Sequence, residues 1–204
     1  MNTTQKWQAI QRAVGARPDG DPGPMTADAI GAKLGISFAD PVSPTPNPST
    51  NSWPRDIRRE MVAFYGEPGE NHTKITVPYP LYYEGQRKTE ITVHSKIAAA
   101  VLRVLEKTLL YYGAEGVHTL KLDVYDGCFN DRPKRGGTSR SVHAYAAALD
   151  FCAEFNSLHQ DHTTALFAKQ AYIPWFEFWE AEGAVSLGRS RDFDYQHVQF
   201  ASLI

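Results

Sequence analysis

Two side chains with catalytic potential lie close together in the stretch SRSVHAYAAALDF, residues 139–151. His143 and Asp150 are separated by mostly small apolar residues. A spacing of seven places two side chains on one face of a helix, since two turns take about 7.2 residues. In a regular strand the same odd spacing places them on opposite faces. The pair can therefore converge on a helix or where a loop bends into a strand, and a chance occurrence in one loop is the simpler alternative.

A second pair lies near the C-terminus, where DFDYQHVQF places Asp194 three residues before His197. In the strand that we predict there, His197 and Gln199 share one face, while Val198 and Phe200 share the other. The apolar pair can face the core while His197 faces a cleft.

Two imidazoles and one carboxylate form a ligand set that catalytic zinc sites use, with the fourth position open to water. We therefore expect Zn2+ as the cofactor, with His143, Asp150 and His197 as its ligands. Zinc lowers the pKa of water to about 7. Asp194 would stand beside the ion as an unligated carboxylate, available as a general base.

The segment SVHAYAAALD resembles the SxHxxGxAxD motif of zinc peptidases that cut peptidoglycan stem peptides. This family contains D-alanyl-D-alanine carboxypeptidases and phage L-alanyl-D-glutamate endopeptidases. The matching positions are Ser141, His143, Ala148 and Asp150. The family's second motif, an acidic residue, two further residues and then histidine, fits Asp194 and His197. The resemblance covers about residues 54–204 and implies the same three zinc ligands, with Asp194 as the catalytic base.

The resemblance also implies further site residues. Arg132 matches the family arginine that polarises the scissile carbonyl or holds the developing oxyanion, with Arg135 and Arg140 as rivals. Ser141 and Gln199 are predicted to contact the substrate. The glycine of the motif is replaced here by Ala146. An alanine fits only if the backbone avoids positive φ or tolerates strain.

The N-terminal piece resembles half of a peptidoglycan-binding module. The predicted wall-binding residues are Trp7, Gln11, Asp19, Gly20 and Thr26. The alternative is a helical hairpin that merely packs against the main domain. We predict helices over residues 4–15, capped by Thr3 or Thr4, and from an N-cap at Thr26 to Gly35. Their expected inward positions are Trp7, Ile10 and Val14 in the first helix, and Ala29, Ile30 and Leu34 in the second.

Three parts follow from this pattern: a helical module over residues 1–36, a proline-rich linker over 37–53, and a zinc peptidase domain over 54–204. The elements expected in the last part are a helix over 55–66, short strands or extended loops at 74–84 and 89–94, a helix over 95–113 capped by Ser95, strands at 119–127 and 147–152, a helix over 163–183 restarted at Pro174, and a closing strand at 195–201. This order predicts an α+β fold, a small antiparallel sheet with flanking helices that carries the zinc site.

The composition of the chain limits which other classes of function and partner fit it. The chain has 204 residues and a formal net charge of -2, which gives no electrostatic argument for nucleic acid or a membrane surface. It shows no signal peptide and no run near the ~18 apolar residues of a membrane span. We expect synthesis in the host cytoplasm, action on the cell wall after release, peptidoglycan as the partner, and a monomer. Cys128 and Cys152 favour free thiols, although one bridge stays possible.

The expected function is therefore an endolysin-type zinc peptidase that cleaves the L-alanyl-D-glutamate bond. The alternatives are a D-alanyl-D-alanine carboxypeptidase, and a non-catalytic wall-binding or virion protein with a vestigial metal site. We interpret His94 and His118 as structural, and His159 and His162 as members of an exposed loop. The aromatic residues of the segment 175–179 are expected to lie mostly in the core.

Overall fold

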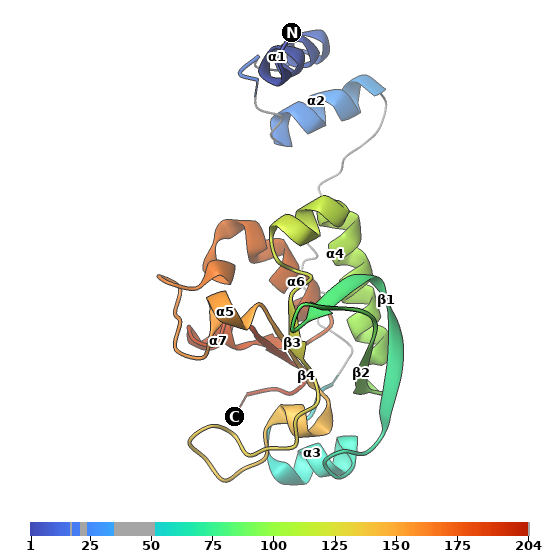
Figure 1. Cartoon of the computed structure of the whole chain (residues 1–204), viewed down its shortest axis with the longest axis vertical. Helices are drawn as coiled ribbons and strands as arrows, with labels where there is room; N and C mark the ends of the chain where they lie inside the picture. The colour runs from blue at the N-terminus through green and yellow to red at the C-terminus, as the bar shows by residue number, and fades with distance from the viewer. Residues whose placement is uncertain (17, 21–23, 35–51, 204) are drawn as a thin grey trace. The chain divides into compact units, whose positions relative to one another are not determined.

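The computed structural model describes residues 1–16, 18–20, 24–34 and 52–203, in two compact units, Met1–Thr45 and Pro46–Ile204 (Figure 1). Almost all of the predicted linker, and the predicted helix stop at Gly35, lie outside the described residues. Among the described residues, no helix combines the length and the apolar character needed to cross a membrane. Each unit is described by itself below.

The N-terminal unit consists of two helices, α1 (Thr3–Val14) and α2 (Pro24–Leu34). The two helices were predicted, but their caps were not. Asn2 caps α1, because its side chain accepts from the Gln5 amide while the Gln5 side chain accepts from the Asn2 amide. The predicted cap at Thr3 or Thr4 is therefore wrong. Thr26 lies within α2 and is not its N-cap.

A buried glutamine joins these helices. The Gln11 Oε1 atom accepts from the Gly20 amide at 2.8 Å, and Nε2 donates to Asp19 Oδ1 at 2.7 Å and Thr26 Oγ1 at 2.9 Å. Gly20 has φ +83°, and a Cβ there would lie 2.5 Å from Thr4 Cγ2. Four predicted wall-binding residues thus contact one another, which accounts for their spacing without a ligand.

The inward face predicted for these helices is partly wrong. Ile10 is 39% exposed and Leu34 is 65% exposed, while Trp7 and Val14 are half-buried. The polar contacts of Gln11 lie at the centre of the helix pair instead. Wall binding by this unit stays a prediction.

The second unit has two antiparallel sheets. The first is a hairpin of β1 (His72–Tyr83) and β2 (Gln86–His94). The second has the order β3-β4-β6-β5, with β3 at Tyr125–Gly127, β4 at Ala148–Phe151, β6 at His197–Gln199 and β5 at Val185–Ser186. The predicted α+β class is confirmed. The hairpin register shifts between Thr76 and Leu81, where Pro78 and Pro80 lack the amide hydrogen that a ladder needs.

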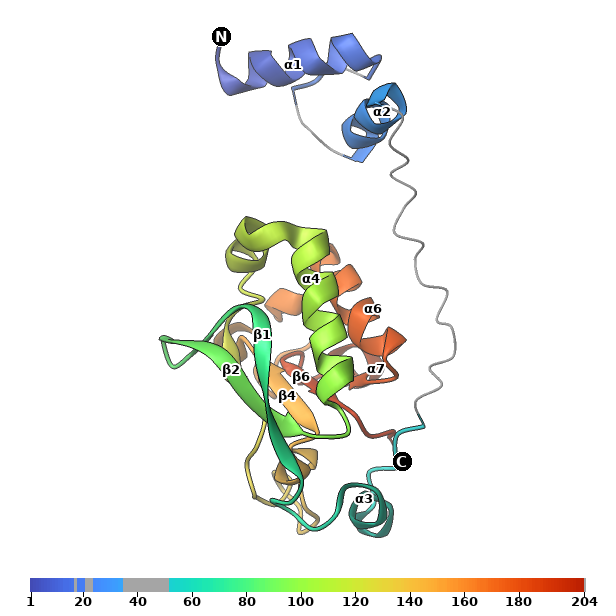
Figure 2. The same ribbon diagram turned by 90° about the vertical axis from the view of Figure 1, so that its right-hand side faces the viewer.

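Helices flank the sheets. They are α3 (Arg58–Tyr65), α4 (Ala98–Thr119), α5 (Ala153–Asn156), α6 (Ile173–Ala181) and α7 (Leu187–Arg191). Figure 2 shows α4 with the β1 and β2 hairpin on one side and α6 on the other. Gly113 interrupts α4 with φ 65° and ψ 169°, where we predicted its end, but a further helical segment continues to Thr119. The predicted cap at Ser95 is wrong, since α4 begins after Ile97 without a side-chain cap.

An aromatic core supports the strand that carries His197. Trp175 and Trp179 are fully buried, as predicted for most of this segment, and the Trp179 ring lies 6.1 Å from that of Phe200. Trp53 packs edge-on against Phe200 at 5.0 Å and donates to the Glu182 carbonyl. Each buried ring of this size contributes roughly 1.5–3 kcal/mol. The end of β6 is therefore firmly held.

The Gln11 contacts generate a prediction for the N-terminal unit. In the full-length protein, Gln11→Ala leaves the Gly20 amide and the Thr26 hydroxyl without these partners. We expect a loss of about 1–3 kcal/mol from the free energy of opening this unit. Hydrogen–deuterium exchange of peptides from residues 1–34 measures the loss. Lys6→Ala, an exposed change on α1, is the matched control, and equal exchange in the two variants would contradict the prediction.

Candidate metal centre

The sheet brings two of the predicted ligands together. Strands β4 and β6 are antiparallel, and their register pairs Asp150 directly with His197. His143 lies in the 3-10 turn Val142–Tyr145, where its amide donates to the Ser141 hydroxyl oxygen at 3.4 Å. The chain bends from this turn into β4. Of the two arrangements predicted for His143 and Asp150, one face of a helix or a loop that bends into a strand, the structure has the second.

Ala146 makes this bend possible. Its backbone is left-handed, with φ 49° and ψ 35°, which an L-residue with a Cβ adopts only at some cost. Its amide donates to the His143 carbonyl at 3.0 Å, and its carbonyl accepts from the His94 amide at 2.8 Å. The bend that delivers His143 is thus a strained conformation, fixed by its hydrogen bonds.

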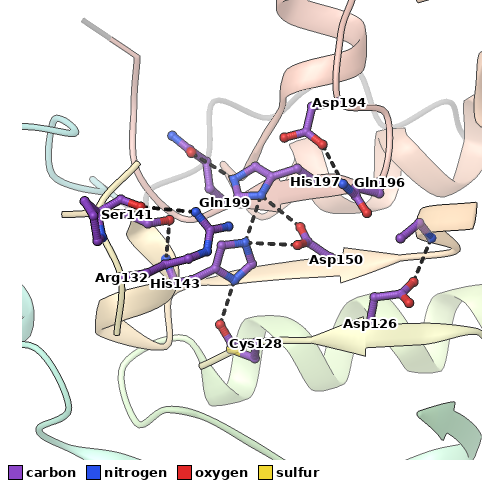
Figure 3. A network of polar contacts seen from close by, with 12 residues as sticks. Asp126, Cys128, Arg132, Ser141, His143, Asp150, Asp194, Gln196, His197 and Gln199 are labelled. Carbon is purple, nitrogen blue, oxygen red and sulfur yellow. Dashed lines mark hydrogen bonds and ion pairs between the residues drawn. The ribbon is translucent and has the colours of Figure 1, made fainter. Parts of the chain in front are cut away.

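Three electron-rich side chains meet at the centre of the site (Figure 3). The Nε2 atom of His143 lies 3.1 Å from His197 Nδ1 and 3.2 Å from Asp150 Oδ2, and His197 Nδ1 lies 2.9 Å from Asp150 Oδ1. Ligands about 2.05 Å from a tetrahedral ion are separated by about 3.3 Å. The three separations are therefore close to those of a metal-bound set.

Each of the two histidine rings donates a hydrogen bond away from the centre of the site. This bond determines that the other ring nitrogen, which faces the centre, carries a lone pair. His143 Nδ1 donates to the Cys128 carbonyl at 2.7 Å, and His197 Nε2 donates to Gln199 Oε1 at 3.1 Å. The Gln199 amide is oriented in turn, because its Nε2 donates to the Ala201 carbonyl at 2.9 Å. When both imidazoles are neutral, they present lone pairs to each other and to a carboxylate, and a proton or a metal cation between these groups removes that repulsion.

The charge balance of the site favours a cation as well. Burial opposes ionisation of Asp150, but its hydrogen bonds to His143 and His197 outweigh burial and hold its pKa well below the usual range. Burial likewise opposes a charged His197, yet the Asp150 carboxylate, with contributions from Asp194 and Gln199, raises the pKa of His197. The field at the centre therefore stabilises positive charge.

The side chains of His143, Asp150 and His197 form a largely buried group that could hold a metal ion. Comparison of the chain with protein-family models, with curated proteins and with solved structures gave no match. The chemistry of the site therefore rests on its own residues.

These three residues line a cavity of about 360 Å³ that also contains the other predicted site residues. Asp194 lies in the loop before β6, and its Oδ1 accepts from Gln196 Nε2 at 2.8 Å. In Figure 3, the side chain of Arg132 extends toward the three candidate ligands, and it donates to the Pro133 carbonyl at 3.3 Å. Ser141 and Gln199 line the cavity as well. Their catalytic and substrate-binding roles stay predictions.

Sequence reasoning missed three partners of the site. The Cys128 carbonyl is a backbone group, which no residue pattern marks. Asp56 and Lys134 line the cavity and form an ion pair at 2.6 Å, although they lie far apart in the sequence. Burial raises the pKa of the Asp56 carboxyl, while Lys134 opposes that shift. Gln199 was predicted to contact substrate, but its hydrogen bond that orients His197 was not foreseen.

The other histidines lie outside this centre. His94 is buried, and its ring bonds the Tyr65 carbonyl and the Lys96 amide, as expected of a structural residue. His118 pairs with Asp123 at 2.7 Å. His159 and His162 are exposed, as predicted. Cys128 and Cys152 are both buried, free thiols.

The outward bond of His197 generates a prediction about metal affinity. Gln199→Leu removes the acceptor that orients the ring but keeps a side chain of similar size. We expect a loss of about 10- to 100-fold in affinity for Zn2+, since partners of ligating histidines have effects of this order. Competition titration with a chromogenic chelator measures the affinity. Gln196→Leu, which removes a cavity amide that bonds no predicted ligand side chain, is the control, and equal affinities would refute the assignment.

Proposed function

We propose that this chain is a zinc-dependent peptidase that hydrolyses an amide bond in the stem peptides of bacterial peptidoglycan, with the L-alanyl-D-glutamate bond as the favoured target. The observation that carries the proposal is the convergence of two imidazole lone pairs and one carboxylate in a cavity that also contains Asp194. Two nitrogens and one oxygen, with room for a further ligand, are typical of catalytic zinc sites.

The residues of the cavity suit amide hydrolysis. When bound, zinc acts as a Lewis acid that polarises a carbonyl and lowers the pKa of water. Asp194 takes a proton from the attacking water and passes it to the leaving amine. Arg132 places a positive charge where the carbonyl oxygen gains negative charge. The hydrogen bond from Gln196 keeps the Asp194 carboxylate in one orientation.

The charge of the cavity wall supports an anionic peptide as the substrate. Four basic residues line the cavity, Arg132, Lys134, Arg135 and Arg191, against three acidic ones, Asp56, Asp150 and Asp194. Lys134 is paired with Asp56, so the arginines are the groups that could meet a carboxylate. In either candidate bond the residue released as the amine carries one free carboxylate: D-glutamate uses one of its two carboxyl groups to continue the stem peptide and keeps the other, and a terminal D-alanine has one. Guanidinium groups bind carboxylates through paired, charge-assisted hydrogen bonds. The resemblance of residues 141–150 to the stem-peptide peptidases points to the same polymer.

The first test separates catalysis from wall binding alone. Chelation should abolish the loss of turbidity of permeabilised bacterial cells, and added Zn2+ should restore it. Asp194→Ala should lower the rate by about 100- to 10,000-fold, the range for loss of a general base, with unchanged zinc content. Glu154→Ala, an exposed carboxylate on α5, is the control. Lysis that survives chelation or the loss of Asp194 would reject the mechanism.

The second test identifies the bond. Mass spectrometry of digested peptidoglycan should show new D-glutamate amino termini, whereas release of D-alanine would select the carboxypeptidase alternative. If the cationic wall binds the free carboxylate, amidation of that group should lower kcat/KM by about 10- to 100-fold, as loss of a charged hydrogen bond does. A digest with neither product would favour a non-catalytic role in wall binding.

A further inference from the structure

The segment that carries Asp194 has an unusual backbone. We call residues 192–196, between α7 and β6, the Asp194 loop. Within it, Asp192 has φ 57° and Asp194 has φ 55°, both left-handed although neither is glycine. Such residues persist only where surrounding contacts impose the conformation. The contacts that hold this loop therefore determine where the Asp194 carboxylate lies.

The downstream half of the loop is tied to the sheet by the main chain. The Gln196 carbonyl accepts from the Phe151 amide at 3.0 Å, and the Gln196 amide donates to the Asn156 carbonyl at 3.1 Å. Tyr195 packs flat on Gly188, where an added Cβ would lie 2.4 Å from the Tyr195 ring. These contacts fix Tyr195 and Gln196, but not the residues before Asp194.

The upstream half is held by the Asp192 amide, which donates to the Gly188 carbonyl at 3.0 Å, and by the Asp192 side chain. The His162 amide donates to Asp192 Oδ1 and His162 Nδ1 bonds Oδ2, both at 2.7 Å, while the Tyr195 hydroxyl donates to Oδ1 at 3.0 Å. Both carboxylate oxygens are thus engaged. His162 comes from the loop after α5, thirty residues earlier in the chain. This set of contacts is called the Asp192 clamp below.

Exposure separates the clamp from the contacts that stabilise the whole domain. The side chains of His162 and Asp192 are 67% and 49% exposed, and exposed ion pairs contribute little to global stability. The clamp nevertheless engages both carboxylate oxygens of Asp192, which lies two residues before the predicted base Asp194. Its geometry suits local positioning better than general stabilisation.

We propose that His162 is a positioning residue, which fixes the Asp194 loop through Asp192 and so holds the Asp194 carboxylate at the metal cavity. The catalytic consequence rests on the proposed function, in which Asp194 is the base. The structural consequence, an ordered Asp194 loop, does not.

The test compares His162→Ala with His159→Ala, an exposed histidine in the same loop for which the structure gives no side-chain hydrogen bond to a described residue. In the full-length protein, we expect His162→Ala to increase hydrogen–deuterium exchange in peptides spanning residues 190–197 by at least about tenfold, because the His197 amide bonds the Asp194 carbonyl. His159→Ala should match the wild type. Unchanged exchange in His162→Ala would overturn the proposal, whether or not the protein is a peptidase.

Kinetics supply the second measurement. A misplaced base lowers kcat by about 10- to 100-fold while KM, zinc content and Tm stay near wild type. His162→Gln, which keeps a donor for Asp192, should recover part of the lost kcat. A fall in zinc content or Tm that parallels the fall in kcat would reveal a merely structural role and would overturn the proposal. A wild type without turnover would reject the proposed function, and the exchange result would still decide the clamp.

Discussion

Two imidazole nitrogens and a carboxylate face one another at separations of 2.9–3.2 Å, and this contact is the constraint on which the site depends. Lone pairs at that distance repel unless a proton or a metal ion lies between them. The protein directs the N–H groups of both rings outward, to the Cys128 carbonyl and to Gln199. The inward atoms are thereby left as acceptors, and a divalent ion is the partner that satisfies all three at once.

The fold holds these acceptors on rigid parts and leaves the other polar groups on loops. Asp150 and His197 are opposite neighbours in the β4 and β6 ladder, and Phe200, just after β6, lies in the aromatic core. Asp194 and Arg132, by contrast, lie on loops, where local hydrogen bonds determine their orientation. In the proposed mechanism, metal binding and catalysis are therefore separable, because a substitution in one of these loops alters Asp194 or Arg132 without removing a candidate ligand.

Much of the site was predictable because its residues are chemically distinctive. The ligand set was predicted from the residue types together with the resemblance of residues 141–150 to the zinc peptidase motif, since the spacing alone left a chance occurrence open, and the interiors of β4, β6 and α6 follow from their apolar patterns. The role of the Cys128 carbonyl could not be predicted, because a backbone group leaves no trace in residue identity. The pairing of Asp56 with Lys134 depends on tertiary contact between distant segments.

The errors in the prediction of local structure have physical causes. The hairpin of β1 and β2 is longer than predicted, because His72, Thr73 and the polar residues 86–88 lie outside the apolar pattern but still pair in the ladder. The helix caps were misplaced because Asn2 caps α1, which makes Thr3 its first residue, and because α2 already begins at Pro24, which places Thr26 inside it. Peptidoglycan as the substrate stays a proposal that rests on the resemblance and on the charge of the cavity.

The most direct test of the account is X-ray absorption at the zinc edge on the purified protein loaded with one equivalent of Zn2+. The account predicts two imidazole ligands and further oxygen ligands at about 2.0–2.2 Å, without sulfur, and loss of one imidazole in His143→Ala or His197→Ala. A spectrum of fully hydrated zinc, a sulfur ligand, or a ligand shell unchanged by these substitutions would contradict it.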